Sequence, residues 1–195
     1  MSKKKYPIRI PRYAAGIRAQ ESRSGSGRNW WAKRWQDVIE GMGLGARLGR
    51  GKNYALSGQV LSMEMSGNRI YSRVLGTREE PYDITIDFIA AEGEAKKRII
   101  SRIKSEPMTL ARILADDLPT EVEMFFRDES LHLFPGGRLS PGKYDMTTDC
   151  SCPDYANPCK HVSAVLIILG EEIARRPSTL LALRGITIKD LCGED

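Results

Sequence analysis

Four side chains that can ligate a metal ion fall within twelve positions of one stretch, TDCSCPDYANPCKHVSAVL. Their spacing is Cys150-x-Cys152, six residues, then Cys159-x-His161. Structural zinc takes four sulfur or nitrogen donors in a tetrahedron, at about 2.3 Å for sulfur and about 2.0 Å for nitrogen. Three thiolates and one imidazole complete this set and leave no position for a reactive water. The pattern therefore predicts one structural Zn²⁺ ion in a binding module rather than in an enzyme.

The alternative is that these cysteines form a disulfide or act as redox-active or buried thiols. A disulfide needs an oxidising compartment, and the N-terminal segment MSKKKYPIRIPRY lacks the apolar stretch of a signal peptide. We expect a cytoplasmic protein, in which clustered cysteines more often bind metal. The ligand set is complete without Cys192 and His132. We expect Cys192 to be a partly buried free thiol, and His132 to be a half-buried strand or turn residue.

The residues around the ligands predict a strand, a loop and a helix. Cys150 and Cys152 lie two apart, so in an extended strand they face the same side. Pro153 and Pro158 bracket a short loop. An apolar stripe with helical spacing follows His161, at Val162, Val165, Leu166 and Leu169. A helix that begins at the ligands would stabilise thiolates through its N-terminal amides and macrodipole.

The pattern C-x-C-x₆-C-x-H, continuing directly into an apolar helix, resembles the SWIM zinc finger. The wider chain is similar to prokaryotic SWIM zinc finger family proteins of archaea and bacteria. The similar segments run roughly from residue 29 to residue 191: NWWAKRWQDVIE, GARLGRGKNYALSGQV, VLGTREEPYDITI, LADDLP, the zinc segment and LLALRGI. Two places depart from the family pattern and neither is a ligand. Tyr155 stands where tryptophan is frequent, and RRPST replaces an acidic Asp-Pro segment.

This resemblance implies a zinc ion and an interaction with nucleic acid or with protein. SWIM modules also occur in or beside helicase-like remodelling ATPases, transposases and recombination factors. The resemblance therefore identifies the metal more closely than the partner, which must be argued from the site and the surface.

The net charge of +5 is unevenly distributed. Residues 1–60 hold thirteen basic and three acidic side chains, a balance of +10, whereas the other 135 residues have a balance of −5. A basic half indicates a surface for polyanions, although a merely solvated basic face is the alternative. We favour nucleic acid. The candidate phosphate contacts are Lys3, Lys4, Lys5, Arg9, Arg12, Arg18, Arg23, Arg28, Lys33, Arg34, Arg47, Arg50, Lys52 and Lys160.

Residues 1–28 read as a basic arm. The segment has two prolines, a Ser-Gly cluster and few apolar residues, so we expect it to be disordered without a target. Tyr6 and Tyr13 alternate with Arg9 and Arg12, a combination that suits base stacking and phosphate contact. This character slightly favours RNA, including a ribonucleoprotein such as the ribosome, over DNA.

The middle of the chain predicts helices around a small sheet. Asn29 is the expected N-cap of a helix to residue 42, with Trp31 and Trp35 in the core. The stretch GMGLGARLGRGK is expected to be a flexible basic linker, with phosphate contact as the alternative. Three antiparallel strands follow within 54–90. Helices are expected over 91–105 and 107–116, then a short helix and a strand before the zinc segment, and short helices after residue 177.

Together these patterns predict an α+β fold, with an antiparallel three-stranded meander and helices followed by a small zinc-built strand-loop-helix module. The expected divisions are the arm at 1–28, an N-terminal α/β domain at 29–118, and a SWIM-type module with C-terminal helices at 119–195. With two histidines, and without a Walker or Rossmann motif, the chain is not expected to be an enzyme. The longest apolar stretch, 162–169, is too short to span a membrane.

The predicted function is a zinc-binding, non-catalytic adaptor for nucleic acid. The alternative is a protein–protein module that serves a helicase-like remodelling ATPase or a DNA repair or recombination complex.

Overall fold

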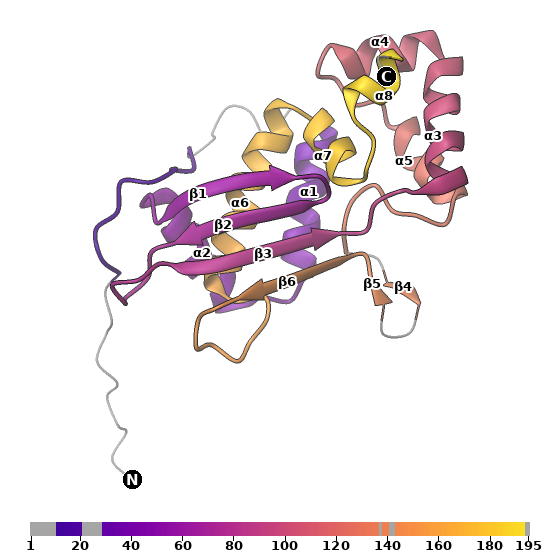
Figure 1. Cartoon of the computed structure of the whole chain (residues 1–195). Helices are drawn as coiled ribbons and strands as arrows, with labels where there is room; N and C mark the ends of the chain where they lie inside the picture. The colour runs from indigo at the N-terminus through magenta and orange to yellow at the C-terminus, as the bar shows by residue number, and fades with distance from the viewer. Residues whose placement is uncertain (1–10, 21–28, 137, 141–142, 194–195) are drawn as a thin grey trace, which may run out of the picture.

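A computed structural model describes residues 11–20, 29–136, 138–140 and 143–193. Its centre is a four-stranded antiparallel sheet with the strand order β1-β2-β3-β6. The strands are β1 (Val60–Ser66), β2 (Arg69–Val74), β3 (Tyr82–Phe88) and β6 (Met146–Cys150). One face of the sheet is covered by α1 (Trp30–Gly41), α2 (Ala46–Leu56) and α6 (Lys160–Arg175), and no described helix covers the other, open face (Figure 1).

The remaining helices gather beyond one end of the sheet (Figure 1). They are α3 (Gly93–Ser105), α4 (Pro107–Leu114), α5 (Glu121–Asp128) and α8 (Ile188–Cys192), with α7 (Ser178–Leu183) between α6 and α8. A two-stranded ribbon, β4 (Arg138–Ser140) and β5 (Lys143–Tyr144), precedes β6. None of these helices combines the length and the apolar character that crossing a bilayer requires, within the part of the chain that the structure describes.

The predicted antiparallel meander is confirmed, but the predicted strand count is one short. In β2 and β3 the side chains alternate between buried and accessible, as expected of strands with one face on the core. The fourth strand, β6, pairs with β3 in the register Ile84↔Cys150 to Phe88↔Met146. The segment expected to build a separate zinc module thus belongs to the central sheet.

The helix α6 lies between the sheet and the other two covering helices. Nine of its sixteen residues are buried, which leaves it little solvent-exposed surface. The indole N–H of Trp35 donates to the carbonyl of Leu166 at 3.1 Å, and Trp31 and Trp35 are buried in the core as predicted.

The stretch expected to be a flexible linker is instead the helix α2. A Cβ built on Gly51 would lie 2.5 Å from Ser163 Cβ of α6 and 3.0 Å from the Lys160 carbonyl. Only glycine permits this close approach, and the packing that results outweighs the low helix propensity of glycine. The strand expected from Tyr54 begins only at Val60, because Tyr54 belongs to α2.

Part of the predicted disordered arm packs on the fold. In residues 11–20, Ala14 and Ala19 are buried, and Ile17 forms a bridge with Val60. The backbone N–H groups of Gly16 and Ala19 donate to the carbonyls of Gly58 and Ala55. The prediction of disorder is therefore wrong for residues 11–20. The rest of the arm, residues 1–10 and 21–28, lies outside the described residues.

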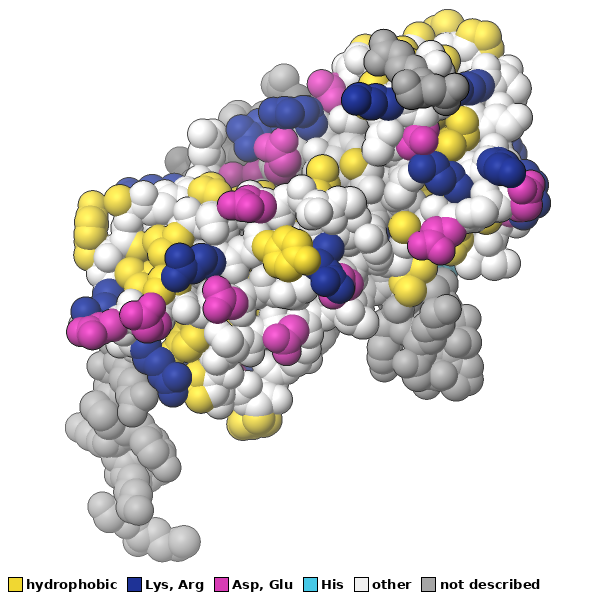
Figure 2. Space-filling view, viewed as in Figure 1, with side chains coloured by type: hydrophobic (Ala, Val, Ile, Leu, Met, Phe, Trp, Pro, Cys, Tyr) yellow, Lys and Arg dark blue, Asp and Glu magenta, His cyan; other side chains and the backbone are white. Residues whose placement is uncertain are grey.

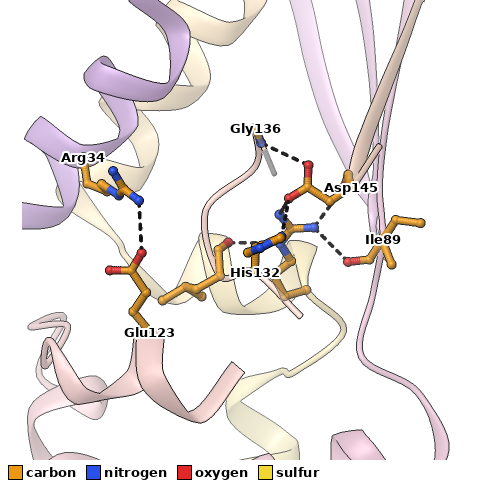
Figure 3. Close-up of polar contacts among 8 residues, drawn as sticks. Arg34, Ile89, Glu123, His132, Gly136 and Asp145 are labelled. Atoms are coloured by element: carbon orange, nitrogen blue, oxygen red, sulfur yellow. Dashed lines mark hydrogen bonds and ion pairs between the residues drawn. The ribbon is translucent and has the colours of Figure 1, made fainter. Parts of the chain in front are cut away.

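A buried ion pair joins the C-terminal segment to the start of β6 (Figure 3). The guanidinium of Arg184 is 3.3 Å from the Asp145 carboxylate and donates to the carbonyls of Leu133, Ile89 and Asp145. Both side chains are nearly inaccessible, at 2% and 3% exposure. Asp145 also accepts from the N–H of Gly136. The nearby His132, expected to be half-buried, has a side chain 43% exposed with its Nδ1 3.5 Å from this carboxylate.

Candidate metal centre

The four predicted ligands come together in space. The donor atoms of Cys150, Cys152, Cys159 and His161 all lie within 4.8 Å of one another. Nδ1 of His161 is 3.9 Å from the sulfur of Cys150 and 3.7 Å from that of Cys159. In a zinc tetrahedron with the usual bond lengths, sulfur and nitrogen lie about 3.5 Å apart and two sulfurs about 3.8 Å apart. The observed spacing is close to these values, so the four donors fit one Zn²⁺ ion.

Two core elements hold these ligands. Cys150 is the last residue of β6, opposite Ile84 of β3. The extended pairing continues at Ser151, whose N–H donates to the Asp83 carbonyl and whose hydroxyl accepts from the Asp83 N–H. Cys159 is the N-cap residue of α6, and His161 is in its first turn. The metal therefore joins the end of an edge strand to the beginning of the central helix.

Electrostatic effects on the three thiols differ before metal binds. Hydrogen bonding from Cys150 lowers the pKa of Cys159 to about 3, against the effect of burial and with help from His161. The same hydrogen bond, together with burial, raises the pKa of Cys150. Burial also raises the pKa of Cys152. Cys159, at the N-terminus of α6, is therefore the favoured thiolate, and zinc must displace the protons of the other two.

The imidazole of His161 is enclosed by aromatic rings and a glycine. It is 2% exposed, and its ring centroid lies 4.6 Å from that of Tyr82 and 5.3 Å from that of Tyr54. A Cβ at Gly76 would lie 2.5 Å from the Tyr82 ring and 3.4 Å from His161 Nε2. Among the described residues Nε2 has no hydrogen-bond partner, whereas Nδ1 faces the sulfurs. This environment orients the ring with Nδ1 as the metal donor.

The sequence did not identify these neighbours of the ligand. The predicted strand begins at Tyr54, although Leu44, Leu48, Gly51 and Ala55 recur at helical spacing, which favours a helix here. Burial raises the pKa of the Tyr54 phenol, and Arg50 opposes this effect. Arg50 precedes Tyr54 by one turn of α2, so the two side chains lie on the same side of this helix.

Three of the predicted phosphate contacts meet beside the zinc site. The ammonium of Lys160 lies 5.6 Å from the ring centroid of Tyr54, which follows Arg50 by one turn on α2. Arg47, one turn before Arg50 on α2, lies 3.8 Å from the carboxylate of Asp154 in the zinc loop. Lys52, also on α2, is exposed.

The other predicted contacts are elsewhere. Arg12 pairs with Glu79 at 2.9 Å, and Arg18 is exposed beside Gly58. Lys33 and Arg34 are exposed on α1, where Arg34 pairs with Glu123 of α5 at 3.4 Å. The remaining six lie outside the described residues: Lys3, Lys4, Lys5, Arg9, Arg23 and Arg28. Cys192, expected to be partly buried, is an exposed thiol outside the metal cluster.

A closed Cys₃His centre between a strand and a helix N-terminus defines a zinc finger of the structural kind. The SWIM zinc finger family model matches residues 143–170, which include all four ligands and most of α6. The chain thus carries a SWIM zinc finger, and the resemblance inferred from the sequence is confirmed.

One bacterial protein is similar along nearly the whole chain. The uncharacterized protein Rv2102 of Mycobacterium tuberculosis is 37% identical over 186 residues, which are 95% of this chain. The chain spans 65% of the length of that relative. No solved structure matches significantly.

Proposed function

We propose that this protein is a non-catalytic, cytoplasmic adaptor that binds nucleic acid through the surface formed by α2, the first turn of α6 and the zinc loop. RNA is the slightly preferred ligand. Zinc acts here as a structural ion, since four protein donors fill its coordination sphere and leave no place for a water or a substrate. Cys150, Cys152, Cys159 and His161 would hold it.

The charge of α2 carries this proposal. The helix ARLGRGKNYAL has three cationic side chains and no acidic one. Arg47 is paired with Asp154, so Arg50 and Lys52 are the phosphate contacts proposed on this helix. Arg50 and Lys52 are exposed, and Lys160 extends the cationic surface onto α6. Such a surface can neutralise several phosphates and release their counterions, which supplies affinity with little sequence preference.

The open face of the sheet differs from this surface. There the basic and acidic side chains lie interspersed (Figure 2). Arg69 pairs with Asp87, and Arg73 lies 3.7 Å from Asp83, on neighbouring strands in each case. These cations are already compensated, so the open face is a poor phosphate surface.

The test is the salt dependence of binding to a fluorescently labelled oligonucleotide, measured by anisotropy with the full-length zinc-loaded protein. Each phosphate contact contributes a slope of roughly 0.7–0.9 to log K against log salt. We expect Arg50→Ala to weaken binding and to reduce this slope by about one contact. Arg73→Ala, on the open sheet face, is the matched control and should bind as the wild type. Equal losses in the two variants, or no binding at 50 mM salt, would refute the proposal.

A protein partner remains the second candidate, because of a groove of about 880 Å³ beside the finger. Helices α1 and α5, the segment 131–136 and β6 line it. Its walls combine apolar side chains, such as Val38 and Phe134, with both charges, including the Arg34–Glu123 pair (Figure 3). This mixture suits a peptide better than phosphates. Val38→Glu should then abolish copurification of the partner and leave oligonucleotide binding unchanged.

A further inference from the structure

The tip of the zinc loop presents an aromatic side chain to solvent. Tyr155 is 96% exposed, the largest exposure among the large hydrophobic residues described. Tyrosine normally buries much of its ring, because burial removes apolar surface from water. The exposed ring of Tyr155 gains none of this stabilisation. The folded protein alone gives no packing reason for an aromatic residue at this position.

The backbone on both sides of Tyr155 is firmly held. The Asp154 carboxylate accepts from the N–H of Ala156 at 3.2 Å and pairs with Arg47 of α2. Asn157 forms two hydrogen bonds with Thr148 of β6, through the side-chain hydroxyl and the backbone carbonyl of Thr148. Cys152 on one side and Cys159 on the other would be fixed by a bound zinc ion. The ring is thus presented from a loop with few conformations to lose on binding, which favours affinity.

The loop that carries this ring borders a helix with cationic side chains. The neighbouring residue Asp154 pairs with Arg47 of α2, Arg50 follows one turn later on α2, and the Lys160 ammonium lies 5.6 Å from the Tyr54 ring. Single-stranded nucleic acids are bound by surfaces that combine exposed aromatic rings with positive charge, with bases stacked on the aromatics and the backbone along the charge. In a duplex the base faces are already stacked on one another.

We infer that Tyr155 stacks on an unpaired base, and that the ligand of the α2–finger surface is therefore single-stranded RNA or DNA rather than a duplex. This inference rests on the proposed function and makes it more specific. The cations bind the backbone of either form. The ring at the loop tip selects the strand whose bases are free.

The experiment measures the affinity of the full-length zinc-loaded protein for a labelled 20-nucleotide single strand, as RNA and as DNA, and for the duplex of the same sequence. Loss of one stacked base costs on the order of 5- to 150-fold in affinity. We expect Tyr155→Ala to lose this factor on single strands only, and Tyr155→Phe to keep the affinity. Tyr71→Ala, which removes a half-exposed tyrosine on the open sheet face, is the control and should change nothing.

Ultraviolet crosslinking adds a positional readout, since the base should attach at Tyr155 and be found there by mass spectrometry. The inference would be overturned if Tyr155→Ala bound single strands as tightly as the wild type, or if it lost equal affinity for the duplex. In either case, salt-dependent binding would still support the proposed function. If the wild type bound neither form, both would fall. Because Tyr155 is almost wholly exposed, unchanged zinc content and circular dichroism should verify that the variants are folded.

Discussion

Two glycines in α2 provide a paired test of how this helix is held against the finger. Gly49 and Gly51 lie in the same helix, two residues apart. A Cβ at Gly49 would meet nothing within 4 Å, whereas a Cβ at Gly51 would lie 2.5 Å from Ser163 Cβ. Replacing each by alanine changes the helix propensity equally, so the difference between the two variants isolates the contact with α6.

The expected magnitudes follow from these distances. Alanine in place of glycine stabilises a helix by roughly 0.8–1.0 kcal/mol, and Gly49→Ala should gain about this much. Carbon atoms pack at about 3.5–4.0 Å, so at Gly51 the new methyl group is about 1 Å too close. Overpacking of this kind costs about 1–3 kcal/mol, so Gly51→Ala should be neutral to about 2 kcal/mol less stable than the wild type. The two variants should then differ by about 1–3 kcal/mol.

Thermal and urea unfolding of the zinc-loaded variants measures this difference. At about 2–4 °C per kcal/mol for a chain of this size, the melting temperatures should differ by roughly 2–12 °C. Gly51→Ala should also loosen the contact of Tyr54 with His161, so zinc should be lost to a chelator faster than from Gly49→Ala. Equal stabilisation in both variants would show that α2 does not pack against α6 as described.

Three further predictions concern the metal and two ion pairs. Cys152→Ser should bind no zinc by metal analysis and melt at least about 10 °C lower, because in such sites the binding energy, on the order of 10 kcal/mol, is folding energy. Asp145→Ala should lose about 3–5 kcal/mol in urea unfolding by leaving the Arg184 charge buried and unpaired, whereas Asp145→Asn combined with Arg184→Met should lose less. The Arg98 guanidinium lowers the pKa of Glu129, so this pair adds stability above about pH 4.3 that is lost as the pH falls below it. Urea unfolding between pH 3 and 7 should show a shallower acid-induced loss for Glu129→Gln than for the wild type.

The metal ligands could be predicted from the sequence because all four lie close together in the chain. Four donors within twelve residues need only a strand end, a turn and a helix start to meet, and Cys159 and His161 lie on that helix as expected. The core tryptophans and the meander were predictable for the same reason. Helical spacing and strand alternation are read within one element.

The rest depended on contacts between distant segments. Gly51 has the sequence character of a linker residue, and only its contact with the backbone of α6 explains why it lies in a helix. Residues 11–20 have the composition of a disordered segment, but their N–H groups donate to the carbonyls of Ala55 and Gly58. The buried pair of Arg184 and Asp145 joins residues 39 positions apart. No spacing rule predicts such pairs, since a charged residue considered alone is expected at the protein surface.

The placement of the ligands determines which parts of the fold lose stability when the metal is removed. A zinc module that folded separately would unfold alone when the metal is removed. Here Cys150 ends a strand paired with β3, and Cys159 begins a helix against which Trp35 of α1 packs. The sheet and the helical layer therefore share the elements that the metal joins. We expect loss of zinc to weaken both in one cooperative transition.

Two probes separate these possibilities, because all three tryptophans lie in α1. Cobalt substituted for zinc reports the metal centre by its absorbance, and tryptophan fluorescence reports α1. During chelator-assisted urea unfolding the two signals should change at the same midpoint, and the amide protons of β1 and β2 should lose their exchange protection together with them. A cobalt transition that preceded an intact tryptophan signal would mean that the finger opens alone. The sheet would then owe its stability to its apolar core without the metal, and the coupling inferred from β6 and α6 would be wrong.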